Sequence, residues 1–367
     1  MTQTLFFTGF PGFLGVQLVP RVLRRDPQVR AVCLIQSRFR PLAAQRVAEM
    51  IAQDPSLSGR VELVDGDITQ ADLGLGHARL HDLANETVEV FHLAAVYDLS
   101  VSLDLAMAVN VAGTRHVTDF ARACADLRRY HYVSTCYVSG RWVGLFTEDD
   151  LVRPGQQFNN HYEHTKHLAE VVVREAMASH DLPTTIYRPS VVGGDADTGA
   201  TQKFDGPYFV AKLLVHGSRT LILPLVGDPD RYQFNFVPRD FVIDAMTELS
   251  GRPDTIGACY ALAEPNPPTI ADMVRYFAAA TGRRIITVPA PKRVVQFALR
   301  RIPGVTRIYD LPEELLDYFD HPAQYDTTNA SKALAGTGID TPPTDVYVQR
   351  IVDFVRANPT VSSAAMV

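Results

Sequence analysis

Short apolar runs alternate with longer amphipathic segments through the first half of the chain, and this alternation narrows the possible folds. Runs rich in β-branched and aromatic residues predict strands over residues 5–8, 29–36, 61–65, 88–93, 130–135 and 184–188. Helical patterns over residues 13–25, 41–53, 103–126 and 162–180 lie among them. Strands joined through helices of this length are typical of βαβ units, whose strands run parallel. We therefore expect an α/β fold built on a doubly wound parallel sheet.

The first expected strand runs directly into a loop whose glycines are spaced Gly-x-x-Gly-x-x-Gly and which opens the first helix. Gly9 suits a tight turn, Gly12 lets backbone approach a pyrophosphate, and Gly15 lets helix and strand pack closely. The helix amino terminus supplies free N–H groups and a favourable dipole to phosphate. We expect a Rossmann-like dinucleotide-binding domain rather than a turn with incidental glycines. The residues expected to hold the cofactor here are Thr8, Gly9, Phe10, Pro11, Gly12, Phe13, Leu14 and Gly15.

The end of the second expected strand bears on which dinucleotide is bound. An NAD site usually places an acidic residue there for the ribose hydroxyls, whereas an NADP site offers arginine to the 2′-phosphate. The segment Gln36-Ser37-Arg38-Phe39-Arg40 contains no carboxylate. Ser37 and Arg38 are therefore predicted to hold the 2′-phosphate of NADP(H), with Arg40 nearby. The alternative is that these arginines simply face solvent.

Tyr162 and Lys166 stand four residues apart at the start of an expected helix, so their side chains share one face. A free phenol has a pKa near ~10 and is a weak acid–base catalyst at neutral pH. A neighbouring ammonium favours the phenolate and brings the pKa towards the working range. Tyr162 can then give a proton to an oxygen that gains charge as hydride arrives, while Lys166 holds the nicotinamide ribose. Such a pair also occurs by chance in helices, so the surrounding motifs decide its meaning.

Upstream of this pair, Ser134 and Thr135 end an expected strand at the sheet edge where doubly wound folds bind ligands. A hydroxyl at that edge can hydrogen-bond a substrate carbonyl and stabilise its developing negative charge. The alternative is that both are polar residues of an ordinary turn.

Several motifs in the same order give the chain a resemblance to the extended short-chain dehydrogenase/reductases over essentially its whole length. The motifs are residues 8–15, Asp67-Ile68, His92-Leu93-Ala94-Ala95, Asn110 with Gly113-Thr114, residues 133–140, residues 162–166 and Tyr187-Arg188-Pro189. The resemblance implies that Asn110 supports a proton relay and that Thr135 is the catalytic hydroxyl beside Tyr162 and Lys166. The cofactor contacts that it implies outside the glycine loop are Asp67, Ile68, Ala94, Ala95, Tyr162, Lys166, Arg188 and Pro189.

Within that superfamily the chain is similar to the fatty acyl-CoA reductases and to the thioester-reductase domains of carboxylic acid reductases. The similarity rests on residues 133–140, on Gly227-Asp228-Pro229 and on Val237-Pro238-Arg239-Asp240. The chain departs from the group at Phe10-Pro11, where Ala-Thr is usual, and we expect it to stand alone without a carrier or adenylation domain.

The resemblance implies an NADPH-dependent reductase that transfers hydride to an acyl thioester, bound to coenzyme A or to a carrier, and gives an aldehyde. Reduction of a ketone or aldehyde by the same residues is an alternative. A sugar-nucleotide epimerase or dehydratase is a further alternative. Cys136-Tyr137 offers no acid after Thr135 for elimination, and Gln233 stands where sugar-nucleotide enzymes tend to have arginine.

The chain of 367 residues is long enough for a large nucleotide-binding domain and a smaller lobe. We expect the NADP-binding domain over residues 1–192, with segments around 230–265 returning to it. A smaller C-terminal substrate-binding lobe is expected over 193–229 and 266–360, with helices over 270–281 and 293–301. Small residues after Pro359 predict a flexible tail over 361–367.

Composition argues against several other classes. A formal net charge of −6 without a dominant basic block argues against a nucleic-acid partner, and no apolar run approaches the roughly 18 residues of a membrane span. The four cysteines are scattered, which favours a reducing compartment. Because the chain enters its strand-and-glycine motif at once, we expect no signal peptide and a cytoplasmic location.

Two further expectations concern metals and assembly. His161, His164 and His167 cluster beside Tyr162, but no carboxylate at ligand spacing completes a metal site, so a solvated helix face and no metal are expected. By analogy with the superfamily, the helices over 103–126 and 162–180 are a candidate homodimer face.

Overall fold

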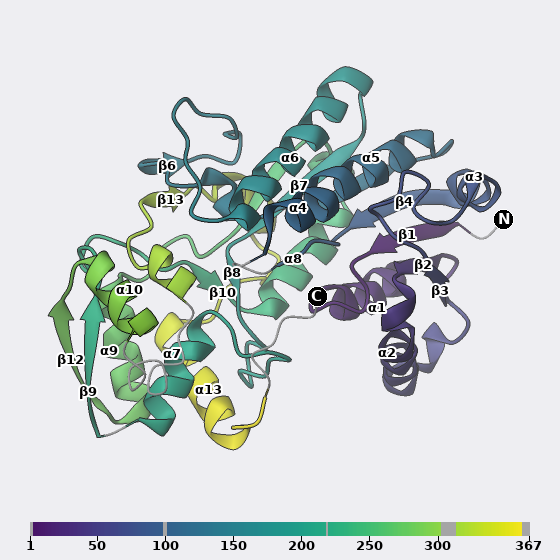
Figure 1. Ribbon diagram of the computed structural model, residues 1–367. Coiled ribbons are helices and arrows are strands. Elements are labelled where there is room, and N and C mark those ends of the chain that lie inside the picture. The colour runs from purple at the N-terminus through teal and green to yellow at the C-terminus, as the bar shows by residue number, and fades with distance from the viewer. Residues whose placement is uncertain (1–2, 98–100, 218, 302–312, 362–367) are drawn as a thin grey trace.

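The computed structural model describes residues 3–97, 101–217, 219–301 and 313–361. Its centre is a seven-stranded parallel sheet of order β11-β7-β5-β4-β1-β2-β3, which confirms the expected doubly wound architecture (Figure 1). The strands are β1 (Thr4–Thr8), β2 (Arg30–Ile35), β3 (Val61–Asp65), β4 (Thr87–His92), β5 (Arg129–Val133), β7 (Thr184–Pro189) and β11 (Cys259–Leu262). The sequence pattern predicts the first six and misses β11.

Helices cover both faces of this sheet (Figure 1). One face carries α1 (Gly15–Arg25), α2 (Arg40–Gln53) and α8 (Arg239–Ser250), and the other carries α3 (His77–Glu86), α5 (Gly113–Ala123) and α6 (His161–His180). Alternate side chains along each strand enter opposite cores. Leu5 and Phe7 pack on the α1 side, whereas Phe6 between them packs with Phe120 of α5. The sheet is therefore buried on both faces, as parallel sheets generally are.

The region 103–126 is not the single α-helix that its pattern predicts. It consists of α4 (Leu103–Ala106), a π-helical turn over Met107–Ala112, and α5. Single π-helical turns inside α-helices often occur at functional sites. Here the turn carries Asn110, whose side chain is buried against α6.

A smaller lobe follows the main sheet (Figure 1). It contains a parallel pair of strands, β9 (Thr220–Leu225) and β12 (Arg284–Pro289), together with α7 (Pro207–His216), α9 (Ile270–Thr281), α10 (Lys292–Arg301) and α13 (Thr344–Ala357). Its core is separate from those of the sheet and includes Tyr208, Phe277 and Tyr347. The helices expected over 270–281 and 293–301 correspond to α9 and α10.

The two parts of the chain interleave more than the expected boundaries suggest. The pair β8 (Val191–Val192) and β10 (Phe236–Val237), followed by α8 and β11, leads the chain back to the sheet. The segment expected to form the lobe over 266–360 is also interrupted. Strand β13 (Ala323–Tyr325) pairs with β6 (Gly144–Phe146) of the large domain, and α12 (Thr328–Leu334) packs Leu334 into the sheet core.

Among the residues that the structure describes, no helix is long and apolar enough to span a membrane. The flexible tail expected over 361–367 falls outside those residues except for Val361.

Candidate active site

The glycine loop between β1 and α1 has no room for side chains at its three glycines. Gly9 has φ +85°, and a Cβ there would lie 2.7 Å from the backbone nitrogen of Ala94. A Cβ on Gly12 or on Gly15 would lie 2.7 Å from the Gly9 carbonyl oxygen. No side-chain hydrogen bond caps α1, and no acidic residue occupies its first turn. Backbone approach and an uncapped helix amino terminus fit the pyrophosphate of a dinucleotide.

A chain of buried hydrogen bonds at the carboxyl ends of β1 and β4 supports the glycine loop. The backbone N–H of Ala94 donates to the Thr8 hydroxyl at 3.2 Å, and that hydroxyl lies 2.7 Å from Nδ1 of His92. Nε2 of His92 lies 2.9 Å from the hydroxyl of Thr114. Burial and the charge of Lys166 lower the pKa of His92 to about 3, so the ring is neutral. These hydrogen bonds therefore orient the segment that starts at Ala94 beside the glycine loop.

The other residues of the glycine loop lie beside its three glycines. Phe10 is buried in the sheet core, and the Phe13 ring lies 5.4 Å from the Arg239 guanidinium. Pro11 is buried as well, and Leu14 is the N-cap residue of α1. The structure thus brings the whole predicted loop to the carboxyl ends of β1 and β4.

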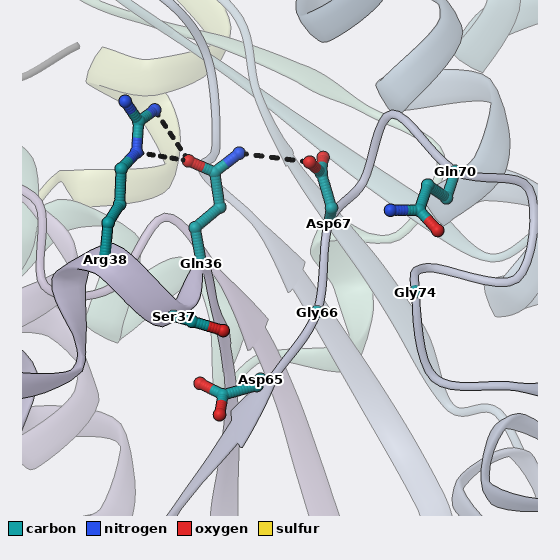
Figure 2. A pocket seen from close by; sticks show the side chains of 8 residues that line it. All are labelled: Gln36, Ser37, Arg38, Asp65, Gly66, Asp67, Gln70 and Gly74. Atoms are coloured by element: carbon teal, nitrogen blue, oxygen red, sulfur yellow. Dashed lines mark hydrogen bonds between the residues drawn. The ribbon is translucent and has the colours of Figure 1, made fainter.

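A pocket of about 460 Å³ opens at the carboxyl ends of β2 and β3 (Figure 2). Arg38 donates from Nε and Nη2 to the side-chain oxygen of Gln36, at 2.9 and 2.7 Å, and Gln36 donates to Asp67 at 3.3 Å. Ser37 also lines the pocket. The full lining is Gln36, Ser37, Arg38, Asp65, Gly66, Asp67, Gln70 and Gly74. Ser37 and Arg38, predicted to hold the 2′-phosphate, therefore line one pocket with Asp67, a predicted cofactor contact that follows a different strand. Ile68, the other predicted contact beside Asp67, does not line it.

Asp65 is a carboxylate in this pocket that the sequence reasoning missed, because it ends β3 rather than β2. Nε of Arg40 donates to it at 3.0 Å, so its charge is paired. Ile68 is buried and packs on Gly113, where a Cβ would come within 2.8 Å of it. Thr69 donates its backbone N–H and its hydroxyl to Asp67, which holds the turn.

Tyr162 and Thr135 lie together at the carboxyl end of β5. Thr135 caps a short 3₁₀ turn over Cys136–Ser139, and its hydroxyl donates to the carbonyl of Pro189 at 3.3 Å. Tyr162 lies in the first turn of α6, and its ring meets Tyr97 edge-on at 5.1 Å. Burial raises the pKa of Tyr162 well above its ordinary value, and the neighbouring Thr135 hydroxyl opposes this in part. The phenol is consequently protonated at neutral pH and can act as a proton donor.

Lys166 lies one turn further along α6 and points towards β5. Its Nζ donates to the hydroxyl of Tyr132 at 3.0 Å and to the carbonyl of Val133 at 2.8 Å. Burial lowers the pKa of Lys166 to about 7, against the charge of Glu170, which raises it. Burial determines the direction of the Tyr162 pKa shift.

Asn110 links the π-helical turn to the loop after β4 and to α6. Its amide oxygen accepts the backbone N–H of Val96 at 2.9 Å, and its amide nitrogen donates to the hydroxyl of Thr165 at 3.0 Å. The predicted catalytic residues Thr135, Tyr162, Lys166 and Asn110 thus come from three different elements and lie around one end of α6.

The Arg188 side chain differs from the sequence expectation of a cofactor contact. Its guanidinium is buried and pairs with Glu170 from Nη2 at 2.6 Å and from Nε at 3.0 Å. Ser134 donates to the same carboxylate at 2.6 Å, and Arg174 at 2.9 Å. Because these contacts engage the guanidinium, the Arg188 side chain holds Glu170, which in turn binds Ser134, the neighbour of Thr135.

Glu170 and Glu163 are two further residues of the site that the sequence pattern did not single out. Glu170 stands four residues after Lys166, so the helix spacing alone is a signal for it. Glu163 is buried beside Tyr162 and accepts from the backbone and side chain of Asn159, at 2.8 and 3.0 Å. Burial raises the pKa of Glu163 to about 7.

No group of three metal-ligand side chains occurs in the described part of the chain. His167 approaches the carbonyl of Val138 at 3.2 Å, and His164 stacks with Phe158.

A family model described as Male sterility protein, of NAD-binding type, matches residues 7–246. The fold and the glycine loop between β1 and α1 together define a nicotinamide-binding domain of the kind found in oxidoreductases. The chain belongs to this family, and hence to the extended short-chain dehydrogenase/reductases, in the branch that includes thioester reductases.

Individual relatives agree with this assignment. The terminal R domain of the myxalamid PKS-NRPS pathway is 27% identical, with a TM-score of 0.81, over 99% of this chain and 93% of that domain. A carboxylic acid reductase of Mycobacterium tuberculosis is 28% identical over 67% of this chain and 23% of its own length. The aldehyde reductase lnbA of Aspergillus flavus is 26% identical over 73% of this chain and 27% of its own length. The chain thus spans about a quarter of these two curated relatives.

Proposed function

We propose that this chain uses NADPH to reduce an acyl thioester, carried by coenzyme A or by a carrier protein, to an aldehyde and a free thiol. The observation that supports it most is the arrangement at the carboxyl end of β5, where the Thr135 hydroxyl adjoins the buried, protonated Tyr162 phenol and Lys166 donates to the carbonyl of Val133 on the same strand. The similarity to an R domain and to a carboxylic acid reductase favours a thioester substrate.

Each residue of the site has a separate role in this reaction. Bound NADPH would supply hydride to the carbonyl carbon. The hydroxyls of Thr135 and Tyr162 would hold the carbonyl oxygen, where negative charge develops. Tyr162 would transfer its proton to that oxygen, and the resulting hemithioacetal would collapse by breaking its C–S bond, which gives aldehyde and thiol. Lys166, one turn after Tyr162 on the same helix face, would hold the nicotinamide ribose of bound NADPH.

A second candidate is simple reduction of an aldehyde or ketone to an alcohol. It is favoured by the similarity to the aldehyde reductase lnbA, and the same residues would serve it. In this case no thiol would be released.

We expect the purified chain to oxidise NADPH with acyl-CoA substrates and to release coenzyme A in equal amount. The assay follows nicotinamide absorbance and free thiol together, with thioesters, aldehydes and ketones as substrates. Oxidation of NADPH by ketones or aldehydes, without thiol release from any thioester, would support the second candidate and exclude the first.

Arg38→Ala is expected to raise the KM for NADPH by about ten- to a hundredfold, because a charged hydrogen bond to phosphate is lost. The KM for NADH should stay the same, since NADH has no 2′-phosphate. Arg40→Ala is the matched control, because its guanidinium is already paired with Asp65. Equal changes for the two cofactors would contradict the assignment of Arg38 to the 2′-phosphate.

A further inference from the structure

The Lys166 ammonium has a phenol partner in the sheet, Tyr132 of β5. Its Nζ donates to the Tyr132 hydroxyl at 3.0 Å and lies 4.5 Å from the centre of the same ring. It also donates to the carbonyl of Val133 at 2.8 Å. Tyr132 is 0% exposed and Lys166 is 3% exposed, so both groups are shielded from water. Because an ammonium has three N–H donors, these two bonds leave one N–H for a ligand within the described part of the chain.

The two bonds also determine where the third N–H points. A lysine side chain is a flexible four-carbon stem whose donors rotate unless acceptors hold them. The three N–H bonds are tetrahedral, so fixing two of them fixes the direction of the third. The Val133 carbonyl is part of the strand backbone, whereas the Tyr132 hydroxyl is supplied by a side chain. Without that hydroxyl the ammonium can rotate about its bond to Val133.

The Tyr132 hydroxyl is itself held close to the residues that support the glycine loop. Burial raises the pKa of Tyr132 well above its ordinary value, and the neighbouring Thr114 hydroxyl opposes this in part. The same Thr114 hydroxyl lies 2.9 Å from Nε2 of His92. The His92 and Tyr132 rings are 5.7 Å apart, and Nδ1 of His92 lies 2.7 Å from the Thr8 hydroxyl. The phenol therefore stays protonated and stands between the lysine and the chain of hydrogen bonds under the glycine loop.

We infer that Tyr132 is a positioning residue, which holds the Lys166 ammonium so that its third N–H is available to the nicotinamide ribose of the cofactor. The inference rests on the role proposed above for Lys166. It assigns the Tyr132 hydroxyl to binding of the nicotinamide half of the dinucleotide and not of the adenine half. A hydroxyl that acted only through packing would affect both halves or neither.

The test compares whole cofactors with an adenine-half fragment. Tyr132→Phe keeps the buried ring and removes the hydroxyl. It should raise the Kd of NADPH and of NADH by the same factor, about three- to tenfold, because both carry the nicotinamide ribose. The Kd of adenosine 2′,5′-bisphosphate, which lacks that ribose, should stay unchanged in the same calorimetric titrations. Tyr130→Phe is the matched control and should change none of the three, because Tyr130 is equally buried on β5 and its hydroxyl contacts Thr118.

Lys166→Met separates the inference from the role on which it rests. It should raise the Kd of NADPH and NADH at least as much as Tyr132→Phe. The double variant should bind no more weakly than Lys166→Met alone, because the hydroxyl acts through the ammonium. If Tyr132→Phe does not fold, Tyr132→Met removes the same hydroxyl with a side chain that adapts to the space.

Two results would overturn the inference about Tyr132 alone. One is an unchanged Kd of NADPH in Tyr132→Phe when Lys166→Met raises it, and the other is an equal loss of affinity for adenosine 2′,5′-bisphosphate. An unchanged Kd of NADPH in Lys166→Met would overturn the role of Lys166 and this inference with it. Thioester reduction is decided separately, by release of thiol from acyl-CoA substrates.

Discussion

Tyr162→Phe is expected to lower kcat by a factor between about 10² and 10⁴ and to leave NADPH binding unchanged. The substitution keeps the ring in its buried place but removes the proton that neutralises the oxyanion, and proton transfer by a positioned side chain contributes about that factor. The raised pKa of the phenol keeps the proton on Tyr162 at neutral pH, so the proton is available when hydride arrives.

The measurement is single-substrate kinetics with the best thioester, beside a fluorescence titration of NADPH. Tyr130→Phe is the matched control, because Tyr130 is equally buried on β5 and its hydroxyl contacts Thr118 rather than the site. The control should keep near wild-type kcat. Activity of Tyr162→Phe within tenfold of wild type would show that another group supplies the proton.

Arg188→Met is expected to lower the free energy of unfolding by about 3–5 kcal/mol, because it leaves the carboxylate of Glu170 buried without its main partner. Arg174→Met removes a partially exposed partner of the same carboxylate and should cost under about 1 kcal/mol. Both changes in the free energy of unfolding can be measured by urea unfolding followed by circular dichroism. The double variant Arg188→Met with Glu170→Met should recover much of the loss, since two apolar side chains leave no buried charge.

The Glu170–Arg188 pair also predicts how the stability of the fold changes at low pH. Burial raises the pKa of Glu170, but the Arg188 guanidinium outweighs it and brings the pKa to about 2. The unfolded chain would titrate this group near its ordinary pKa of about 4.3. The pair therefore stabilises the fold above about pH 4.3, and this contribution is lost as the pH falls towards 2. The stability difference between wild type and Glu170→Gln should shrink over that range, and a constant difference would contradict the assignment.

Local pattern was sufficient for much of the fold. Six strands of the sheet and the helices between most of them follow from runs of apolar residues with period two or 3.6, which a short window of sequence contains. The π-helical turn at Asn110 was not predictable in this way, because the apolar pattern continues through it and the contacts of Asn110 to Val96 and Thr165 determine its place. Strand β11 was missed because it is short and gains its place by pairing with β7.

The candidate site likewise contains residues that a local pattern predicts and residues that only the tertiary structure brings in. The spacing of Gly9, Gly12 and Gly15 is a local pattern, so the sequence predicts the dinucleotide-binding loop. The structure explains each glycine, because a Cβ at any of the three positions would clash with neighbouring atoms. Asp65 comes from a neighbouring strand, and no local pattern shows that Arg40 pairs with it.

By itself the sequence determined the parallel sheet, the dinucleotide loop and the pairing of Tyr162 with Lys166 on one helix face, because each of these depends on residues close together in the chain. Only the tertiary structure decided what those side chains contact. It placed the Arg188 guanidinium on Glu170 and the Lys166 ammonium on Tyr132. The reason is physical: burial and hydrogen bonding act between residues that are distant in sequence, so they follow from packing and not from spacing.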